Sequence, residues 1–181
     1  MTGLILMGGK GERLQGVIPM GMPKCAVMIG GRPVWQYATM AAAQMCDGGV
    51  MYAPGPFADI GIAGRIVPDN GQGTVAVVRA AKPRPLAVFN GDTILFGAPT
   101  FDVPGKPGLY AVQGHDLVND RNETAFYIVV RGVAFPAGAK NLEDVRLTDV
   151  IEVADTLSFI DCGTVAGLQL AQTRARTSGW S

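Results

Sequence analysis

The sequence has few of the residues that build metal centres and disulfide frameworks. Its three cysteines, Cys25, Cys46 and Cys162, are widely spaced without a C-x-x-C pair, and His115 is the only histidine. This pattern indicates neither a disulfide framework nor a zinc site. Lysine plus arginine and aspartate plus glutamate each number 15, so no net charge draws the 181-residue chain to nucleic acid or to an acidic membrane surface.

Long apolar runs are also missing from the sequence. No stretch approaches the roughly 20 apolar residues of a membrane span, and no basic leader precedes the first apolar run. We therefore expect a cytoplasmic protein without a membrane partner. The length suits a single domain over residues 1–181, with no repeats or low-complexity tract, and a homo-oligomer stays open.

What the sequence does have is glycine, and three glycines closely follow the first apolar run. Gly8, Gly9 and Gly11 come where a buried strand would end in a loop. Such glycines let backbone N–H groups turn toward an anion, and Arg13 and Lys24 add the positive charge that a triphosphate needs. The pattern predicts a phosphate-binding loop, the alternative being a glycine-rich turn with incidental basic residues.

Two better-known glycine loops do not match this stretch. A P-loop needs Lys-Ser or Lys-Thr after its last glycine, where this chain has Glu12 and Arg13. A dinucleotide-binding loop needs a glycine where Leu14 stands, and an acidic residue about 20 positions later that the chain also lacks. The loop therefore belongs to another class of nucleotide site.

Short apolar runs alternate with helical patterns along the first half of the chain. Alternation of this kind predicts an α/β protein, a three-layer α/β/α sandwich around a mostly parallel mixed sheet. Strands are expected at residues 4–7, 50–53, 65–67, 86–89, 108–112, 125–135 and 157–161, and helices at 33–45, 74–81, 142–153 and 165–176.

Two aspartates follow predicted strands. Asp92 lies just beyond the carboxyl end of the strand at 86–89, which is where open α/β sheets place their ligands, and its carboxylate suits Mg²⁺. An ordinary Gly-Asp turn is the alternative. Asp161 ends a second strand, and its alternative is a helix N-cap or an Asx-turn.

These segments together resemble the sugar nucleotidyltransferases, also called nucleoside-diphosphate-sugar pyrophosphorylases. The pattern G-G-x-G-x-R-L, followed nine residues later by P-K, is similar to the signature of the family, and V-F-N-G-D-T and F-I-D-C-G-T are similar to its two magnesium-binding segments. The resemblance implies a Rossmann-like, glycosyltransferase-A-like nucleotidyltransferase fold. It also implies an Mg²⁺ cofactor held by Asp92 and Asp161, and transfer of a nucleoside monophosphate from an NTP to a sugar 1-phosphate with release of pyrophosphate.

The resemblance implies a role for individual residues as well. The N–H groups of Gly8 to Gly11 and the guanidinium of Arg13 would hold the β and γ phosphates, and Lys24 would bridge the α-phosphate and the acceptor phosphate. The expected nucleotide-binding residues are Leu6, Gly8, Gly9, Gly11, Gln72, Gly73, Thr74, Asn90 and Gly91.

Two of the segments behind these assignments match the family only in part. Gln72-Gly73-Thr74 resembles the segment that approaches the base, although a Thr-capped helix start is nearly as good a reading. Residues 141–144, N-L-E-D, resemble a segment of some guanylyltransferases and slightly favour GTP, but an N-cap before an acidic first turn explains them equally well.

The chain departs from the family at the acceptor. No Glu-Lys pair occurs between Ala111 and Arg131, where the family holds the sugar phosphate. Arg131 is the expected replacement because it precedes a run similar to the family's G-x-Y-x-F strand, and Arg121 is the second candidate. The missing pair leaves two other functions open: transfer to a non-sugar phosphate, such as phosphocholine or the molybdenum cofactor, and a catalytically silent nucleotide-sugar-binding regulatory protein.

Overall fold

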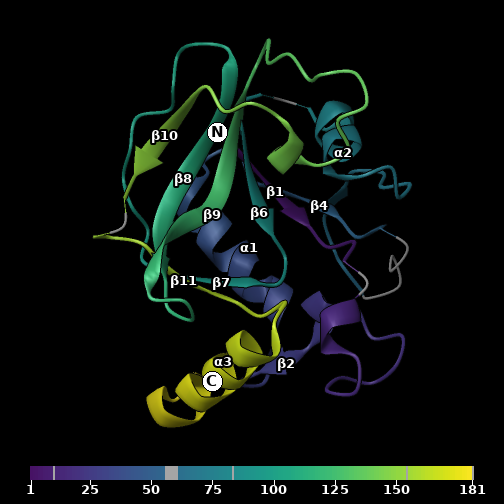
Figure 1. The fold of residues 1–181 in the computed structure, drawn as a ribbon, viewed down its shortest axis with the longest axis vertical. Helices are drawn as coiled ribbons and strands as arrows, with labels where there is room; N and C mark the ends of the chain where they lie inside the picture. The colour runs from purple at the N-terminus through teal and green to yellow at the C-terminus, as the bar shows by residue number, and fades with distance from the viewer. Residues whose placement is uncertain (10, 56–60, 83, 154, 181) are drawn as a thin grey trace.

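A computed structural model describes residues 1–9, 11–55, 61–82, 84–153 and 155–180. Within them, a mixed sheet has the strand order β5-β4-β1-β6-β9-β8-β11-β7, with β10 also paired to β8, and β2 and β3 form a separate hairpin (Figure 1). The strands are β1 Thr2–Leu6, β2 Met28–Ile29, β3 Arg32–Pro33, β4 Val50–Ala53, β5 Arg65–Ile66, β6 Leu86–Asn90, β7 Thr93–Phe96, β8 Gly108–Asp116, β9 Arg121–Val130, β10 Asp149–Glu152 and β11 Ser158–Asp161. The helices are α1 Val34–Met45, α2 Thr74–Ala80 and α3 Val165–Ser178.

The parallel half of the sheet is centred on β1. Its last residue, Leu6, is paired with Ala53 of β4 and with Asn90 of β6, so the carboxyl ends of three strands meet at one edge. Leu4 and Ile5 are both fully buried although they point to opposite faces. A strand that is apolar on both faces needs cover on both, and the helices supply it.

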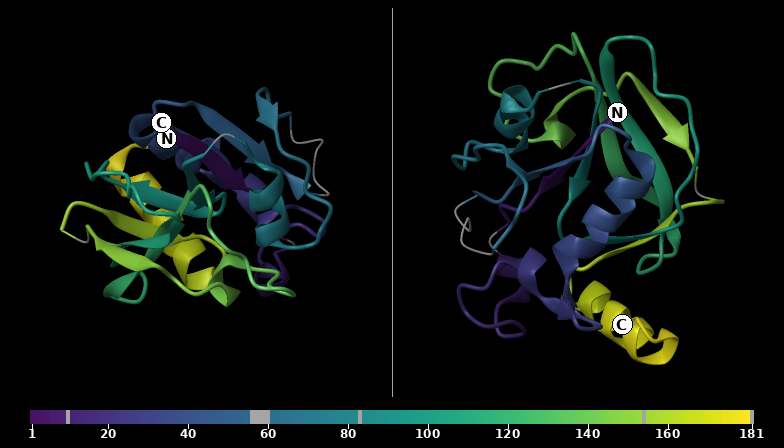
Figure 2. Two further views of the ribbon diagram at one scale, coloured as in Figure 1. Left: turned by 90° about the horizontal axis from the view of Figure 1, so that it is seen from above. Right: turned by 180° about the vertical axis from the view of Figure 1, so that it is seen from behind.

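Helices α1 and α2 cover opposite faces of this half. In α1, Ala38 and Ala42 pack in one cluster with Phe89, and in α2, Val75 and Val78 pack in another cluster with β1 and β6. The view from behind in Figure 2 shows α1 lying across the sheet, with α3 beyond its lower end. The predicted arrangement, a mixed and mostly parallel sheet between helices, is confirmed. Within the described residues, no helix is both long enough and apolar enough to cross a membrane.

The other half contains the antiparallel pairs. Strand β9 runs antiparallel to both β6 and β8, with Val129 opposite Leu86 at the amino end of β6. The tip of the β8–β9 hairpin is stabilised by Asp116, which is 2% exposed and accepts a hydrogen bond of 2.8 Å from the Val118 N–H. Because Val129 lies opposite Leu86, the carboxyl end of β9 lies at the edge of the sheet opposite to the carboxyl ends of β1 and β6.

The helix predicted for residues 142–153 is wrong. A single 3₁₀ turn, Leu142–Asp144, forms there, and β10 follows and pairs in parallel with β8. A reciprocal capping box between Asn141 and Asp144 closes the turn, and Leu142 is buried against α2. The β-branched residues of β10 gain a hydrogen-bonding partner from β8, a pairing distant in sequence that local periodicity cannot report.

Candidate active site

Two carboxylates and a lysine converge on Gly163. Strand β11 pairs antiparallel with β7, Asp161 lies opposite Thr93, and the Cys162 N–H donates to the Asp92 carbonyl at 2.9 Å. A Cβ placed on Gly163 would lie 2.6 Å from Asp92 Oδ2, 2.9 Å from Asp161 Oδ1 and 3.1 Å from Lys24 Nζ. Lys24 and Asp92, which are 68 positions apart in sequence, therefore meet in one small volume. Only a glycine at position 163 leaves that volume open.

Lys24 links this cluster to the glycine loop. It begins the 3₁₀ turn Lys24–Ala26 after Pro23, and its ammonium forms an ion pair with Asp92, whose side chain is 8% exposed. Its stem passes close to Gly9, where a Cβ would lie 3.3 Å from the Lys24 nitrogen. Burial by itself would lower the pKa of Lys24, but the neighbouring Asp92 outweighs burial and raises it. Lys24 is therefore held charged at the bottom of the cluster.

The surroundings of Asp161 disfavour the charged form of its carboxyl group. Burial raises the pKa of its carboxyl group, and the charge of Asp92 raises it further. The Gly163 N–H donates to Asp161 Oδ1 at 2.8 Å, so the Asx-turn expected as an alternative is present, while the N-cap of α3 is Thr164. One lone pair serves the turn, which leaves acceptor capacity for a cation.

The cluster forms one end of a cleft of about 530 Å³ across the carboxyl ends of β1 and β6. Ten of the residues expected from sequence line this cleft, and four further residues complete its wall. The expected residues are Leu6, Gly8, Gly9, Arg13, Lys24, Gly73, Thr74, Asn90, Asp92 and Asp161, and the others are Asp69, Gly71, Val77 and Glu143.

Three expected nucleotide-binding residues do not line the cleft. Gly91 lies beneath its floor, where its N–H donates to the Leu6 carbonyl at 2.8 Å. Gly11 lines an adjoining hollow of about 330 Å³ together with Arg13 and Lys24, and Gln72 is exposed. Lys10, inside the glycine loop, lies outside the described residues.

The structure does not bring Arg131 to the cleft. Because β9 runs antiparallel to β6, Arg131 follows β9 at the edge opposite to Asp92, where it is exposed. Arg121 begins β9 at the nearer edge, but it is ion-paired with Glu123 and is absent from the cleft wall. Among the described lining residues, Arg13 and Lys24 are the only cations.

The segment around Thr74 joins α2 to the turn at residues 142–144. The Thr74 hydroxyl accepts a hydrogen bond of 3.0 Å from the Leu142 N–H, and a Cβ on Gly73 would lie 2.4 Å from the Lys140 carbonyl oxygen. The reading of Thr74 as a helix cap is wrong, because Gly73 is the N-cap of α2 and makes no side-chain cap. This junction places Glu143 in the cleft wall. The capping box that offered another explanation for residues 141–144 is present as well.

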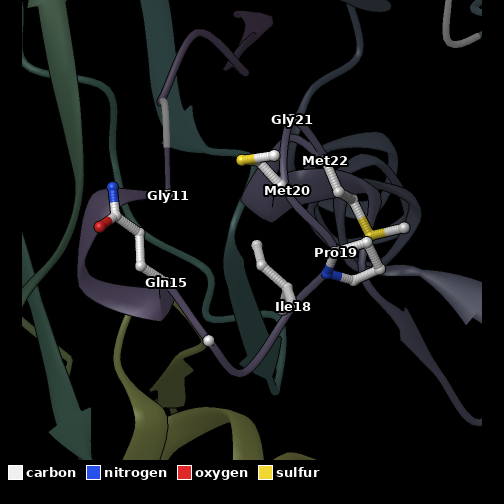
Figure 3. Close-up of a pocket in the computed structure, with 8 residues that line it drawn as sticks. Gly11, Gln15, Ile18, Pro19, Met20, Gly21 and Met22 are labelled. Carbon is white, nitrogen blue, oxygen red and sulfur yellow. The ribbon is translucent and has the colours of Figure 1, made fainter.

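A second hollow of about 410 Å³ lies beside the glycine loop, as Figure 3 shows. It is lined by Gly11, Gln15, Gly16, Ile18, Pro19, Met20, Gly21 and Met22. None of these residues carries a titratable side chain, so the hollow offers no acid or base for catalysis. The cleft with its four carboxylates and two cations is therefore the candidate active site.

The carboxylate pair Asp92 and Asp161 suits the divalent cation Mg²⁺. Within the part of the chain that the structure describes, no three His, Cys, Asp or Glu side chains gather as a metal cage. Mg²⁺ does not need one, because it is commonly held by one or two carboxylates together with substrate phosphates and water. The pair Asp92 and Asp161 fits that donor set.

Comparison with solved structures identifies the fold. A protein described as a glucose-1-phosphate thymidylyltransferase, from Bacillus anthracis, matches with a TM-score of 0.67 at 16% identity, over 97% of this chain and 96% of its own. An inositol-1-phosphate CTP transferase from T. maritima matches with a TM-score of 0.62 at 13% identity, over 97% of this chain and 96% of its own. A UDP-glucose pyrophosphorylase from Acinetobacter baumanii matches with a TM-score of 0.64 at 11% identity, over 94% of this chain and 91% of its own. This chain has the nucleotidyltransferase fold. No protein-family model and no curated sequence matches it.

The nucleotidyltransferase fold is the one that the sequence resemblance implies, and it explains where the side chains lie. Asp92 follows β6, Asp161 ends β11 and Lys24 begins a 3₁₀ turn, and all three lie at the carboxyl edge of the sheet. The edge residue that sequence reasoning missed is Asp69, which follows β5 as Asp92 follows β6. The same signal, an aspartate just past a strand, could have found it.

Proposed function

We propose that this protein transfers a nucleoside monophosphate from an NTP to a sugar 1-phosphate. The observation that carries the proposal is the convergence of Asp92, Asp161 and Lys24 on Gly163, at the edge of a nucleotidyltransferase fold. Solved structures that share the fold are described as transferases acting on glucose 1-phosphate and inositol 1-phosphate. The F-I-D-C-G-T segment that ends in this cluster favours a sugar phosphate over phosphocholine or the molybdenum cofactor.

The reaction needs no nucleophile from the protein. An oxygen of the acceptor phosphate attacks the α-phosphorus, a new P–O bond forms, the bond to the β-phosphate oxygen breaks, and pyrophosphate leaves. Catalysis then depends on positioning the two substrates and on offsetting their negative charge. Lys24 would neutralise charge at the α-phosphate and the acceptor phosphate, and Arg13 would bind the departing pyrophosphate.

Asp92 and Asp161 would hold Mg²⁺ in the loaded enzyme. The ion, when bound, supplies positive charge that screens one phosphate from the other. Without substrate, Lys24 neutralises Asp92, so the proposed roles of both residues require Lys24 to turn from the carboxylate toward phosphate as the site fills.

The remaining cleft residues would bind the rest of the NTP, with the backbone N–H groups of Gly8 and Gly9 directed to its phosphates and the others to its nucleoside. Leu6, Gly8 and Gly9 form the floor at the end of β1, with Asn90 beside them, and Gly73 and Thr74 lie across from it. GTP is the first nucleotide to test. A cytoplasmic location, where NTPs and sugar phosphates are available, is part of the proposal.

A catalytically silent nucleotide-sugar-binding protein is the second candidate. The specific observation in its favour is that, among the described residues, the cleft wall offers only Arg13 and Lys24 as cations and no third one for the acceptor phosphate. Pyrophosphate release, measured with each NTP against a panel of sugar 1-phosphates and phosphocholine, separates the candidates. The proposal expects release that requires both a sugar phosphate and Mg²⁺. Nucleotide-sugar binding without any release would favour the silent protein, and release with phosphocholine alone would replace the acceptor.

Arg13→Ala is expected to weaken binding of the NTP by at least about tenfold, and binding of the NDP-sugar much less. The reason is that the departing β and γ phosphates, which Arg13 would bind, are present only in the NTP, whereas the second phosphate of the NDP-sugar comes from the acceptor. Calorimetric titration of both ligands measures the difference, with Arg174→Ala as a control because Arg174 lies in α3, outside the cleft. Equal losses for both ligands would exclude this role for Arg13.

Gly163→Ala is expected to lower kcat by at least about tenfold and to leave the melting temperature within a few degrees of wild type. The added methyl group would come within 3.1 Å of Asp92, Asp161 and Lys24, so these side chains must move apart. Gly105→Ala is the matched control, because a Cβ there meets nothing within 4 Å. Wild-type kcat in Gly163→Ala would show that the cluster tolerates displacement and is not the reacting centre.

A further inference from the structure

Among the described residues, both cations of the cleft lie at one end, called the charged end here, and none lies at the other. Lys24, Asp92 after β6 and Asp161 at the end of β11 meet at Gly163 on one side of β1, and Arg13 lies near enough to act on Asp161 electrostatically. On the other side, at the ends of β1 and β4, the wall is made by Asp69 and Gly71, and the start of α2 continues it. If phosphates occupy the charged end, as the proposed function requires, the base lies at the end that contains Asp69.

Asp69 is held in a fixed orientation there. Its Oδ1 accepts a hydrogen bond of 2.9 Å from the Gly71 N–H, and its Oδ2 faces the ends of β1 and β4. A Cβ on Gly8 would lie 2.6 Å from Oδ2, and a Cβ on Gly55 would lie 3.2 Å from it. Two glycines therefore give this carboxylate access to the floor of the cleft, and no described residue donates a hydrogen bond to Oδ2.

An oriented carboxylate distinguishes among the bases because it only accepts hydrogen bonds. Guanine has two adjacent donors on one edge, N1–H and the N2 amino group, which match two carboxylate oxygens. Adenine and cytosine place a lone pair beside their single amino group, and uracil and thymine flank their N3–H with two carbonyl oxygens. Each of those edges would bring a lone pair against Asp69, and a polar group left unpaired in a site costs affinity.

We propose that Asp69 is the residue that selects the nucleotide, its carboxylate accepting hydrogen bonds from N1–H and N2–H₂ of guanine, so that the NTP is GTP. The proposal rests on the proposed function for the placement of the phosphates. It gives Asp69 a role in specificity and none in the transfer step. Asp69 Oδ1 can serve both the Gly71 N–H and the base, because a carboxylate oxygen accepts two hydrogen bonds.

The test is the base preference of Asp69→Asn, measured as Kd for GTP, XTP, ATP, CTP and UTP without an acceptor. Asparagine can keep the turn by accepting from the Gly71 N–H, but it presents one donor and one acceptor to the base. Xanthine has a carbonyl where guanine has the amino group, so it matches asparagine. Wild type is expected to prefer GTP, and the variant is expected to lose at least about tenfold in GTP affinity, gain at least about tenfold in XTP affinity, and prefer XTP.

Two controls distinguish base recognition from a structural role. Asp102→Asn makes the same chemical change at an exposed position outside the cleft and should leave every Kd unchanged. Glu143→Gln changes the other carboxylate of this part of the wall and should leave the order of bases unchanged. A purely structural Asp69 predicts equal losses for all five nucleotides and no gain for XTP, which would overturn the proposal.

Other outcomes would also overturn the proposal, and they can be told apart from failure of the proposed function. A wild type that binds UTP, ATP or CTP as tightly as GTP excludes guanine selection, as does a change of preference in Glu143→Gln instead of Asp69→Asn. If GTP binds selectively through Asp69 but no pyrophosphate is released with any acceptor, the assignment of Asp69 stands and the proposed reaction falls. If no NTP binds, both fall.

Discussion

Asp161→Asn is expected to lower kcat by about three orders of magnitude and to leave the fold unchanged. Removing one of two carboxylates that hold Mg²⁺ should cost several kcal/mol of transition-state stabilisation, and about 4 kcal/mol corresponds to roughly a thousandfold. The fold should survive, because an asparagine side chain can still accept the hydrogen bond from the Gly163 N–H that Asp161 Oδ1 accepts at 2.8 Å. The measurement is acceptor-dependent pyrophosphate release over a range of Mg²⁺ concentrations, with thermal unfolding as the check on folding.

Asp161→Asn is a cleaner substitution than Asp92→Asn. Asp92 is 6% exposed and is ion-paired with Lys24, so its replacement also leaves a lysine without its partner. We expect Asp92→Asn to lose as much kcat and to lose stability as well. Asp155→Asn, an exposed change a few residues before β11, is the matched control. Near wild-type kcat for Asp161→Asn at limiting Mg²⁺ would show that Asp161 is no ligand.

Lys24→Ala is expected to reduce turnover by at least about a thousandfold in both directions of the reaction. Its charge would act at the phosphate that is transferred, which is the same group in synthesis and in pyrophosphorolysis, so the loss should appear in kcat and not mainly in KM. Forward rates come from pyrophosphate release, and reverse rates from NTP formation out of NDP-sugar and pyrophosphate.

Two further variants separate charge from structure at this position. Lys24→Arg keeps the ion pair with Asp92 and should fold normally, while recovering only part of the activity because the guanidinium is larger. Lys106→Ala removes an exposed lysine outside the cleft and should change nothing. A Lys24→Ala variant no more impaired than Lys106→Ala would reduce Lys24 to a surface charge.

The parts of the fold that local sequence reports were predictable. The apolar run ending at Gly8 is β1, the helical spacing between Pro33 and Met45 is α1, and the F-I-D segment is β11. Asp92 was placed by the rule that open α/β sheets bind ligands at the carboxyl ends of their strands, and Asp161 by the resemblance of F-I-D-C-G-T to a family segment. The structure brings both to one edge.

The parts that depend on non-local pairing were not predictable. Residues 149–152 form β10 because β8 is available beside them, which no window around Asp149 reveals. Arg131 was assigned from its neighbours in sequence, but the direction of β9 decides its place, and the antiparallel register puts it at the far edge. Asp69 follows a strand that was expected, Arg65–Ile66, but its place in the cleft depends on the loop that brings its carboxylate against Gly8 and Gly55.

The central claim is that nucleotidyl transfer occurs in this cleft, and the fate of the phosphates tests it most directly. The protein would be incubated with GTP labelled at either the α or the γ phosphate, together with Mg²⁺ and a sugar 1-phosphate. The account predicts α-label in the NDP-sugar and γ-label in pyrophosphate, in equal amounts, both dependent on the acceptor and both lost in Asp161→Asn. Label appearing in inorganic phosphate, or release that is independent of the acceptor, would contradict it.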